Sequence, residues 1–327
     1  MKKKILKTIY TLGGFAPFHW ATRGGLGVLM YHRFSFEPDA RRISVNDFAA
    51  HLGYLKKHCR VLSLTEAVER MGEESLPPNA VVITIDDGYA DSFDIAFPLL
   101  RKFDLPATVY AVTDFLDGKC WLWTDLMRFL LSNTKSENLE IEFANDDQIE
   151  AKLTDKNDKY EIAGRINARL KKLPNAEKDA KIAEIAEALK VEIPEKPIAG
   201  YAPISWTQAR EMDAGKVEIE SHTRTHPILT NIGESELVDE LQTSKTRLEN
   251  QLQKTIKHFC YPNGSLNETA AEAVKRAGYV SAATTEYGFN DKNADRFLLK
   301  RFDAPAAIEN FAQTTSGFES LRKTVKI

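Results

Sequence analysis

Short apolar runs alternate with segments of helical spacing along most of this chain. In 45–58, for example, Phe48, Leu52 and Leu55 fall on one helical face. This alternation is typical of βα units with parallel strands, which are buried on both faces. Roughly seven such units can be counted, as a barrel of parallel strands needs. The predicted strands are 27–31, 81–85, 106–112, 217–221, 256–262, 279–285 and 297–304.

The alternation stops near Asp117 and resumes after residue 200. The segment between them is rich in lysine and glutamate and has helical patterns, clearest in 121–132 and 178–190. We therefore expect an α/β body over residues 25–327 that is interrupted by a helical insertion at about 118–200.

Composition narrows the class of protein. A chain of 327 residues can bury a sizeable core. Its net charge of -3 and pI of about 6.2 do not indicate a nucleic-acid partner. The three cysteines are widely spaced and form no CxxC pair. They predict neither a disulfide framework nor a thiolate zinc site, and they favour a reducing compartment.

The N-terminal residues 1–24 predict an amphipathic helix. Ile5, Ile9 and Leu12 share one helical face, and Lys4 and Lys7 flank it. The apolar run is too short to span a bilayer. Three interpretations remain open here: a helix packed on the body, a helix lying on a membrane surface, and a signal peptide.

Two adjacent carboxylates, Asp86 and Asp87, end the apolar strand 81–85. Like charges this close raise each other's proton affinity, and burial raises it further. A positive partner, either a side chain or a bound cation, would resolve the conflict.

A pair of histidines could hold a bound cation as that positive partner. His222 and His226 follow the strand 217–221, and on a helical turn their side chains would share a face. Two imidazoles and one carboxylate form the ligand set of a catalytic zinc site. Both motifs follow strands, at the edge where parallel α/β folds assemble active sites. The alternative for the histidine pair alone is a surface turn.

Four motifs in this order resemble those of the NodB-like polysaccharide deacetylases, carbohydrate esterase family 4. They are TIDDGYAD, SHTRTHP, FCYPNG and LLKRFDAP. The resemblance implies a distorted (β/α)7 barrel and a divalent metal, usually zinc. It also implies hydrolysis of acetyl groups from sugars.

By this resemblance Asp87, His222 and His226 bind the metal, and Asp86 is the base that takes a proton from the attacking water. The backbone N–H of Tyr261 would stabilise the tetrahedral oxyanion.

Two family positions are replaced in this chain. The arginine usually found beside the YP motif is missing, so Arg301 is expected to orient Asp86, with a surface pair to Asp303 as the alternative. Because no histidine follows His258, the candidate general acid is His32, which could equally be a structural or substrate contact.

Substrate contacts are predicted from the motif 261–264 and from aromatic side chains that could pack on sugar rings. The alternatives are a tight loop for the motif and a core position for each aromatic, which we favour for Trp121 and Trp123. The predicted substrate-binding residues are Tyr261, Pro262, Asn263, Gly264, Trp206 and Tyr89.

The sequence thus predicts a metal-dependent hydrolase that removes acetyl groups from N-acetylated sugars of a polysaccharide or its lipid-linked precursor. The alternatives are an amidohydrolase acting on a non-sugar amide and an inactive carbohydrate-binding relative. The N-terminus predicts a cytoplasmic protein, with a place at the inner face of the membrane, in preference to a secreted one.

Overall fold

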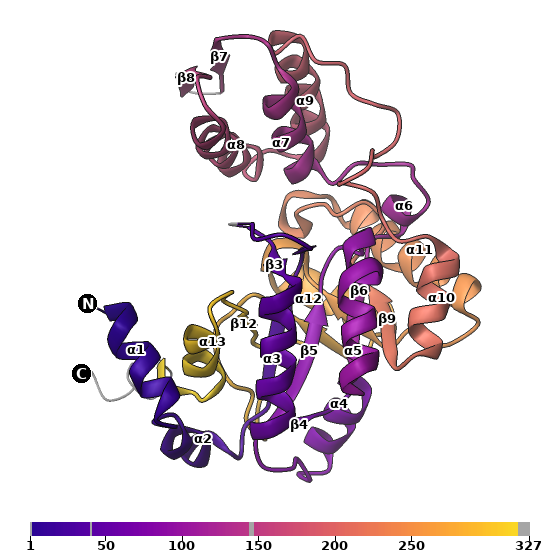
Figure 1. Ribbon diagram of the computed structural model, residues 1–327. Helices are drawn as coiled ribbons and strands as arrows, with labels where there is room; N and C mark the ends of the chain where they lie inside the picture. The colour runs from indigo at the N-terminus through magenta and orange to yellow at the C-terminus, as the bar shows by residue number, and fades with distance from the viewer. Residues whose placement is uncertain (1, 40, 144–146, 320–327) are drawn as a thin grey trace.

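A curled sheet of parallel strands forms the body of the protein (Figure 1). The structure is a computed structural model that describes residues 2–39, 41–143 and 147–319. The strand order is β11-β10-β9-β6-β5-β1-β12, with β4 paired to β5. This architecture confirms the predicted distorted (β/α)7 barrel. The strands are β1 Gly27–Tyr31, β4 Arg60–Val61, β5 Ala80–Ile85, β6 Ala107–Ala111, β9 Val217–Ser221, β10 His258–Cys260, β11 Ser281–Ala283 and β12 Phe302–Asp303.

The segment 296–303, which contains the edge strand β12, closes the ring by connecting β1 with the opposite edge strand β11. Phe302 pairs in parallel with Leu29 of β1, while Leu299 forms an isolated parallel bridge to Ala283 of β11. One segment therefore contacts both edges of the sheet. The predicted strand 297–304 was too long, because only Phe302–Asp303 is a regular strand. Arg301 lies between the bridge and β12, and it is buried.

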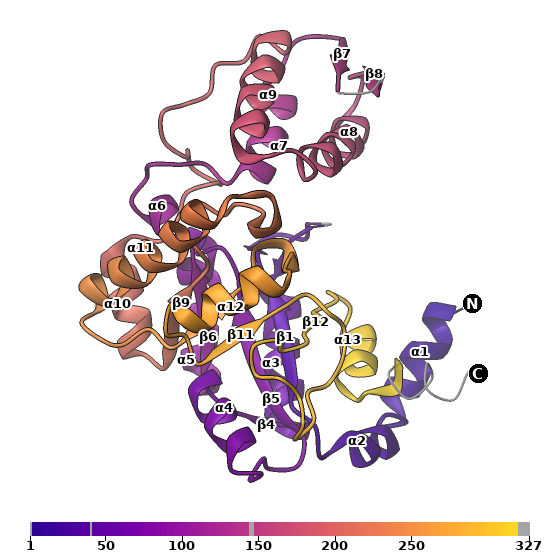
Figure 2. The same cartoon turned by 180° about the vertical axis from the view of Figure 1, so that it is seen from behind.

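Helices cover the sheet from both sides. The helices α3 and α5 lie in front of the sheet in Figure 1, and α12 lies in front of it in Figure 2. Serine and asparagine side chains cap several of them, as Ser44 does for α3. The helices of the body are α3 Val45–His58, α4 Leu64–Gly72, α5 Phe97–Phe103, α6 Thr113–Leu116, α10 Trp206–Ala214, α11 Glu234–Leu252, α12 Glu268–Arg276 and α13 Ile308–Thr315. Two strands, β2 Phe34–Ser35 and β3 Ile43–Ser44, form a small separate sheet.

A π-helical turn precedes α5. A single helix over 92–103 would place Pro98 near its middle, but residues Ser92–Ala96 form a π-helix and α5 begins at Phe97. Proline has no N–H to donate, and its ring clashes with the carbonyl four residues earlier. The wider π-turn accommodates Pro98 within the first turn of the α-helix.

The insertion is a separate lobe with its own apolar core (Figure 1). It contains α7 Trp123–Asn133, α8 Lys156–Leu170 and α9 Asn175–Ala188, together with an antiparallel hairpin of β7 Asn138–Glu142 and β8 Gln148–Lys152. The insertion contains helices, as expected, but the prediction missed the hairpin, in which Leu139 and Ile141 alternate with exposed residues as a half-buried strand requires. Trp123 is in this core and Trp121 packs against it, as favoured.

The N-terminal segment forms two helices, α1 Lys2–Thr11 and α2 Ala16–Thr22, which are separated by a turn at Gly13 with positive φ. Leu6 and Tyr10 pack against the body. The apolar face predicted from the sequence points to solvent, since Ile5, Ile9 and Leu12 are 54%, 36% and 80% exposed. None of the helices in the described ranges is long and apolar enough to cross a bilayer.

Candidate active site

The carboxyl ends of the parallel strands meet at one edge of the barrel. His32 follows β1, Asp86 and Asp87 follow β5, and His222 follows β9. Because parallel strands run in one direction, side chains that follow them in sequence gather at the same edge. This is how residues up to 190 positions apart come to share one site.

Asp87, His222 and His226 place three potential metal ligands around one point. The Nε2 atoms of the two histidines each lie 3.6 Å from Oδ1 of Asp87. One ligand atom from each residue lies within 4.8 Å of the other two. Nδ1–H of His222 donates a hydrogen bond to the carbonyl oxygen of Cys260 at 2.7 Å. This hydrogen bond leaves Nε2 of His222 unprotonated and facing Asp87.

The histidines converge through an irregular loop, which corrects the predicted helical turn. Residues 222–228 are neither helix nor strand, and Thr223 and His226 have φ of 72° and 64°. Asp87 also has a positive φ, 76°. Non-glycine residues rarely adopt this conformation, which costs about 1–3 kcal/mol each and is concentrated at functional sites.

The chemistry of the three ligands fits a divalent cation. Burial lowers the pKa of His222 to about 4, and it lowers the pKa of His226 well below its usual value. Both imidazoles are therefore neutral at pH 7, which is the form that coordinates a metal. One carboxylate and two neutral imidazoles leave a further position for water or substrate, as in catalytic zinc sites.

Arg301 binds Asp86 through both carboxylate oxygens. The two nitrogens Nη1 and Nη2 of Arg301 lie 2.7 and 2.8 Å from Oδ1 and Oδ2 of Asp86. Arg301 is 1% exposed, and its Nε donates to the carbonyl oxygen of Thr284. Burial alone would raise the pKa of Asp86, but the Arg301 guanidinium holds it well below its usual range. Of the two alternatives for Arg301, the structure shows the pair with Asp86.

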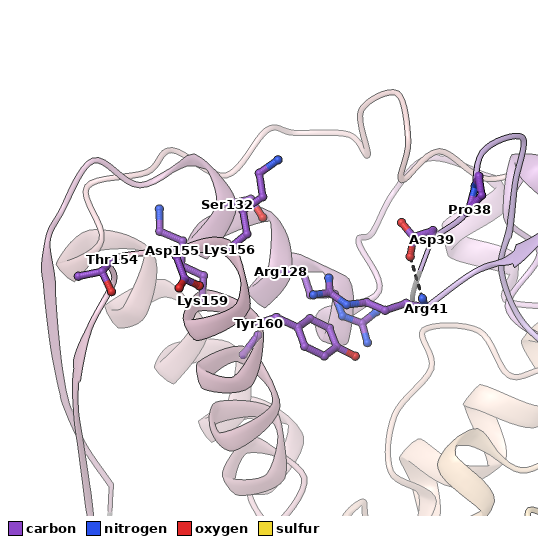
Figure 3. A pocket seen from close by; sticks show the side chains of 11 residues that line it. Pro38, Asp39, Arg41, Arg128, Ser132, Thr154, Asp155, Lys156, Lys159 and Tyr160 are labelled. Atoms are coloured by element: carbon purple, nitrogen blue, oxygen red, sulfur yellow. Dashed lines mark hydrogen bonds between the residues drawn. The ribbon is translucent and has the colours of Figure 1, made fainter. Parts of the chain in front are cut away.

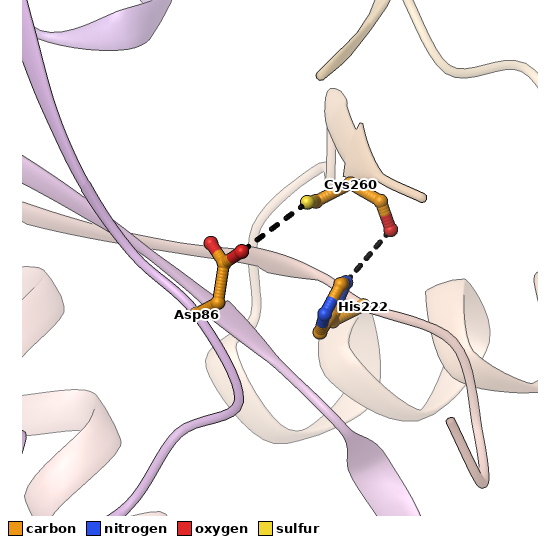
Figure 4. Close-up of side chains that lie close together, drawn as sticks. All are labelled: Asp86, His222 and Cys260. Carbon is orange, nitrogen blue, oxygen red and sulfur yellow. Dashed lines mark hydrogen bonds between the residues drawn. The ribbon is translucent and has the colours of Figure 1, made fainter. Parts of the chain in front are cut away.

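Cys260 lies beside Asp86 and Arg301, and the sequence reasoning missed it. Figure 4 shows Cys260 with Asp86 and His222. Asp86, His222 and Cys260 also offer three potential ligand atoms within 4.8 Å of one another. The Cys260 Sγ lies 3.1 Å from Nη2 of Arg301, however, and burial raises the pKa of its thiol. A protonated thiol beside a guanidinium does not fit a cation site. Its place within the predicted strand 256–262, near the end that leads into the motif 261–264, was the available signal.

His32 lies beside Asp86 at the rim of the site. Its Nε2 is 3.7 Å from Oδ2 of Asp86, and its side chain is 45% exposed. A histidine that contacts both the carboxylate and solvent can exchange protons with each. Its role as general acid stays a prediction.

The loop 261–264 follows β10 at the same edge. The N–H of Tyr261 donates to the carbonyl oxygen of Ala283 at 3.0 Å, so the predicted oxyanion role of this amide is wrong for this structure. Pro262 has no N–H. The backbone N–H of Asn263 makes no hydrogen bond within the described parts of the chain. It is therefore a candidate donor to the oxyanion. Gly264 has a φ of 66°, and a Cβ there would collide with Thr285.

Comparison with known proteins identifies the family. The sequence profile described as polysaccharide deacetylase matches residues 73–194 and 197–282. The chain belongs to the polysaccharide deacetylase family. This deacetylase is therefore a hydrolase that acts on carbon–nitrogen bonds other than peptide bonds.

Two curated relatives are similar to this deacetylase in sequence. YxkH of Bacillus subtilis, a family member by name, is 22% identical over 278 residues, which cover 84% of this chain and 70% of YxkH. The poly-beta-1,6-N-acetyl-D-glucosamine N-deacetylase of Staphylococcus epidermidis is 31% identical over 85 residues, 25% of this chain and 29% of that enzyme.

Solved structures support the fold of the deacetylase. The Streptococcus pyogenes deacetylase PplD, solved with acetate, aligns with a TM-score of 0.61 at 19% identity over 90% of this chain and 99% of its own. IcaB from Ammonifex degensii aligns with a TM-score of 0.59 at 20% identity, over 89% of this chain and 97% of its own.

The two aromatic side chains predicted to contact the substrate differ in exposure. Tyr89 is 3% exposed, and Arg33 covers its ring with the guanidinium carbon 3.8 Å from the centroid. Trp206 is half-buried at the start of α10, and its indole N–H donates to Asp117. The prediction that Tyr89 packs on a sugar ring was wrong. For Trp206 it stays a prediction.

A buried carboxylate, Asp125 of α7, connects the rim of the barrel to the insertion. Its Oδ2 accepts from the hydroxyl of Tyr89 at 2.5 Å and from Nη1 of Arg33 at 3.0 Å. Its Oδ1 accepts from Nη1 of Arg128 at 2.6 Å. The sequence reasoning missed this network, although Arg33 directly follows His32.

Proposed function

We propose that this polysaccharide deacetylase is a metal-dependent enzyme that removes acetyl groups from N-acetylated sugars of a polysaccharide or its lipid-linked precursor. One observation carries the proposal. Asp87, His222 and His226 surround a single point, and Asp86, held by Arg301, has a carboxylate oxygen within 4.8 Å of a ring nitrogen of His222. The relative from S. epidermidis, named for its action on an N-acetylglucosamine polymer, supports the choice of substrate.

The residues of the site account for each step of amide hydrolysis. A divalent cation, with Zn²⁺ as our candidate, would act as a Lewis acid and lower the pKa of a water molecule from its bulk value to about 7. Asp86, which Arg301 keeps ionised and oriented, accepts a proton as water attacks the acetyl carbonyl carbon. The bond between carbon and nitrogen then breaks, and the leaving nitrogen gains a proton, for which His32 is the candidate donor. The products are acetate and a free amine.

Acetate release with and without a chelator tests this function. We expect purified enzyme to release acetate from N-acetylglucosamine oligomers, to lose this activity with EDTA, and to regain it with added Zn²⁺. Acetate can be measured with a coupled enzymatic assay. A zinc-loaded protein that releases acetate from simple acetamides but from no sugar would contradict the sugar substrate. A protein that binds zinc and the oligomers without turnover would be the inactive relative.

We also propose that the N-terminal helices bind the surface of an anionic membrane and hold the enzyme at its cytoplasmic face. Ile5 and Ile9 in α1, Leu12 just after it and Trp20 in α2 are exposed large apolar side chains. Lys4 and Lys7 also lie in α1. An exposed apolar face with lysines beside it suits the interface of a bilayer that contains anionic lipids. All three cysteines are free thiols, in keeping with a reducing compartment.

Vesicle sedimentation tests the membrane contact. We expect the full chain to sediment with phosphatidylglycerol vesicles and not with phosphatidylcholine vesicles. Replacing Leu12 with aspartate should weaken this binding about tenfold or more, since burying one leucine contributes about 1.5–3 kcal/mol. Ile198→Asp, which changes an apolar residue of the insertion that is 42% exposed, is the matched control. Equal sedimentation of Leu12→Asp and wild type would refute the contact.

A further inference from the structure

A basic cavity lies between the barrel and the insertion (Figure 3). Its volume is about 740 Å³, and it is walled by Pro38, Asp39 and Arg41 of the barrel and by α7 and α8 of the insertion. Four basic side chains and two acidic ones line it, which leaves a formal excess of two positive charges. The basic residues are Arg41, Arg128, Lys156 and Lys159, and the acidic ones are Asp39 and Asp155.

Both acidic groups in the cavity are hydrogen-bonded to backbone amides. Oδ1 of Asp39 accepts from the N–H of Arg41 at 2.8 Å, and Oδ1 of Asp155 accepts from the N–H of Asp158 at 2.9 Å. These hydrogen bonds hold each carboxylate in a local turn without removing its negative charge. The wall keeps its formal excess of two positive charges.

Tyr160 holds the two guanidinium groups in place. The guanidinium carbon of Arg41 lies 3.0 Å from the ring centroid of Tyr160, and that of Arg128 lies 5.6 Å from it. Figure 3 shows both groups beside this ring, between the loop and α8. Arg128 is also bound by Asp125. Guanidinium groups that are held before a ligand arrives lose less entropy on binding, and their planar N–H donors match phosphate oxygens.

The cavity is linked to the candidate active site through Asp125. The carboxylate that binds Arg128 also binds Arg33, which follows His32, and Tyr89, which lies two residues after Asp87. The insertion itself follows β6, so it rises from the same edge of the barrel as the site residues. The cavity and the candidate active site are therefore both associated with this edge of the barrel.

We propose that this cavity binds a phosphate or diphosphate group carried by the acetylated substrate, so that the enzyme selects phosphate-bearing glycans. The inference rests on the proposed deacetylation and names its substrate class. The excess of positive charge, the fixed guanidinium groups and the position of the cavity support it. Charge-assisted hydrogen bonds from arginine and lysine are the usual means of holding phosphate.

A matched pair of substrates tests the inference. We expect kcat/KM for a phosphorylated N-acetylglucosamine oligomer to exceed that for the unphosphorylated oligomer about tenfold. The double substitution Lys156→Gln/Lys159→Gln should remove most of this preference, and so should raising the salt concentration to about 0.5 M, because screening weakens exposed charge pairs. Lys292→Gln, which removes an exposed lysine paired with Glu74 outside the cavity, should keep the preference.

Calorimetry separates failure of this inference from failure of the proposed function. The wild type should bind the phosphorylated oligomer about tenfold more tightly than the neutral one, and the double variant should not. Equal affinity for both oligomers would overturn the inference whatever the turnover. Binding of inorganic pyrophosphate without a preference between the oligomers would also overturn it, since the cavity would then hold free anions only. Absence of acetate release from both oligomers would refute the proposed deacetylation, while the binding preference still decides the cavity.

Discussion

Replacing Asp86 with asparagine should lower kcat for acetate release by about 10²–10⁴-fold and leave the zinc content unchanged. General-base catalysis contributes a factor of this size, and an amide cannot accept the proton. The metal should stay because Asp86 is outside the proposed ligand set, while its Oδ1 and Oδ2 are bound to Arg301. Steady-state kinetics and zinc analysis by atomic emission on the same sample measure both outcomes.

The neighbouring aspartate provides the matched control. Asp87→Asn should lose both zinc and activity, because Asp87 is the carboxylate between the two histidines. Asp86→Asn also leaves the buried Arg301 without a full counter-charge, which destabilises the fold by up to about 3–5 kcal/mol. Circular dichroism melting should therefore accompany the zinc analysis. Loss of zinc from folded Asp86→Asn, with zinc kept in Asp87→Asn, would mean that the two roles are reversed.

Replacing His222 with alanine should remove most of the bound zinc and with it the activity. The substitution deletes one of the three proposed ligands, the imidazole whose Nε2 faces Asp87. Loss of a group that merely orients a ligand already costs about 10–100-fold in metal affinity. We expect a larger fall in affinity for the ligand itself. Competition with a zinc-binding dye gives the dissociation constant.

His58→Ala is the control for this experiment, because His58 is an exposed histidine at the end of α3. Its zinc affinity and activity should equal those of the wild type. A zinc content in His222→Ala that matches this control would contradict the assigned ligands. It would also remove the observation on which the proposed function stands.

Local pattern was sufficient for the central strands of the barrel and for the site residues that follow them. The run that ends in Asp86 and Asp87 is buried along its whole length, as predicted. Parallel strands bring such ends together at one edge, so the convergence of Asp87 with His222 and His226 could be expected from the sequence. The four motifs also identified the family, which the profile match confirms.

Contacts between distant segments decided what local pattern left open. The partner of Arg301 depends on how 296–303 closes the ring, and the sequence alone allowed a surface pair equally well. The amide of Tyr261 is taken by β11, and the ring of Tyr89 is covered by Arg33. The Asp125 network and the basic cavity exist only because the insertion packs over the edge of the barrel.

The sequence by itself determined which chemical groups stand at the ends of the strands, because the periodicity of side chains along a strand is a local property. Only the tertiary structure decided which of these groups are paired, covered or open to a substrate. Hydrogen bonding and burial depend on neighbours that lie far away along the chain, and no local pattern records them.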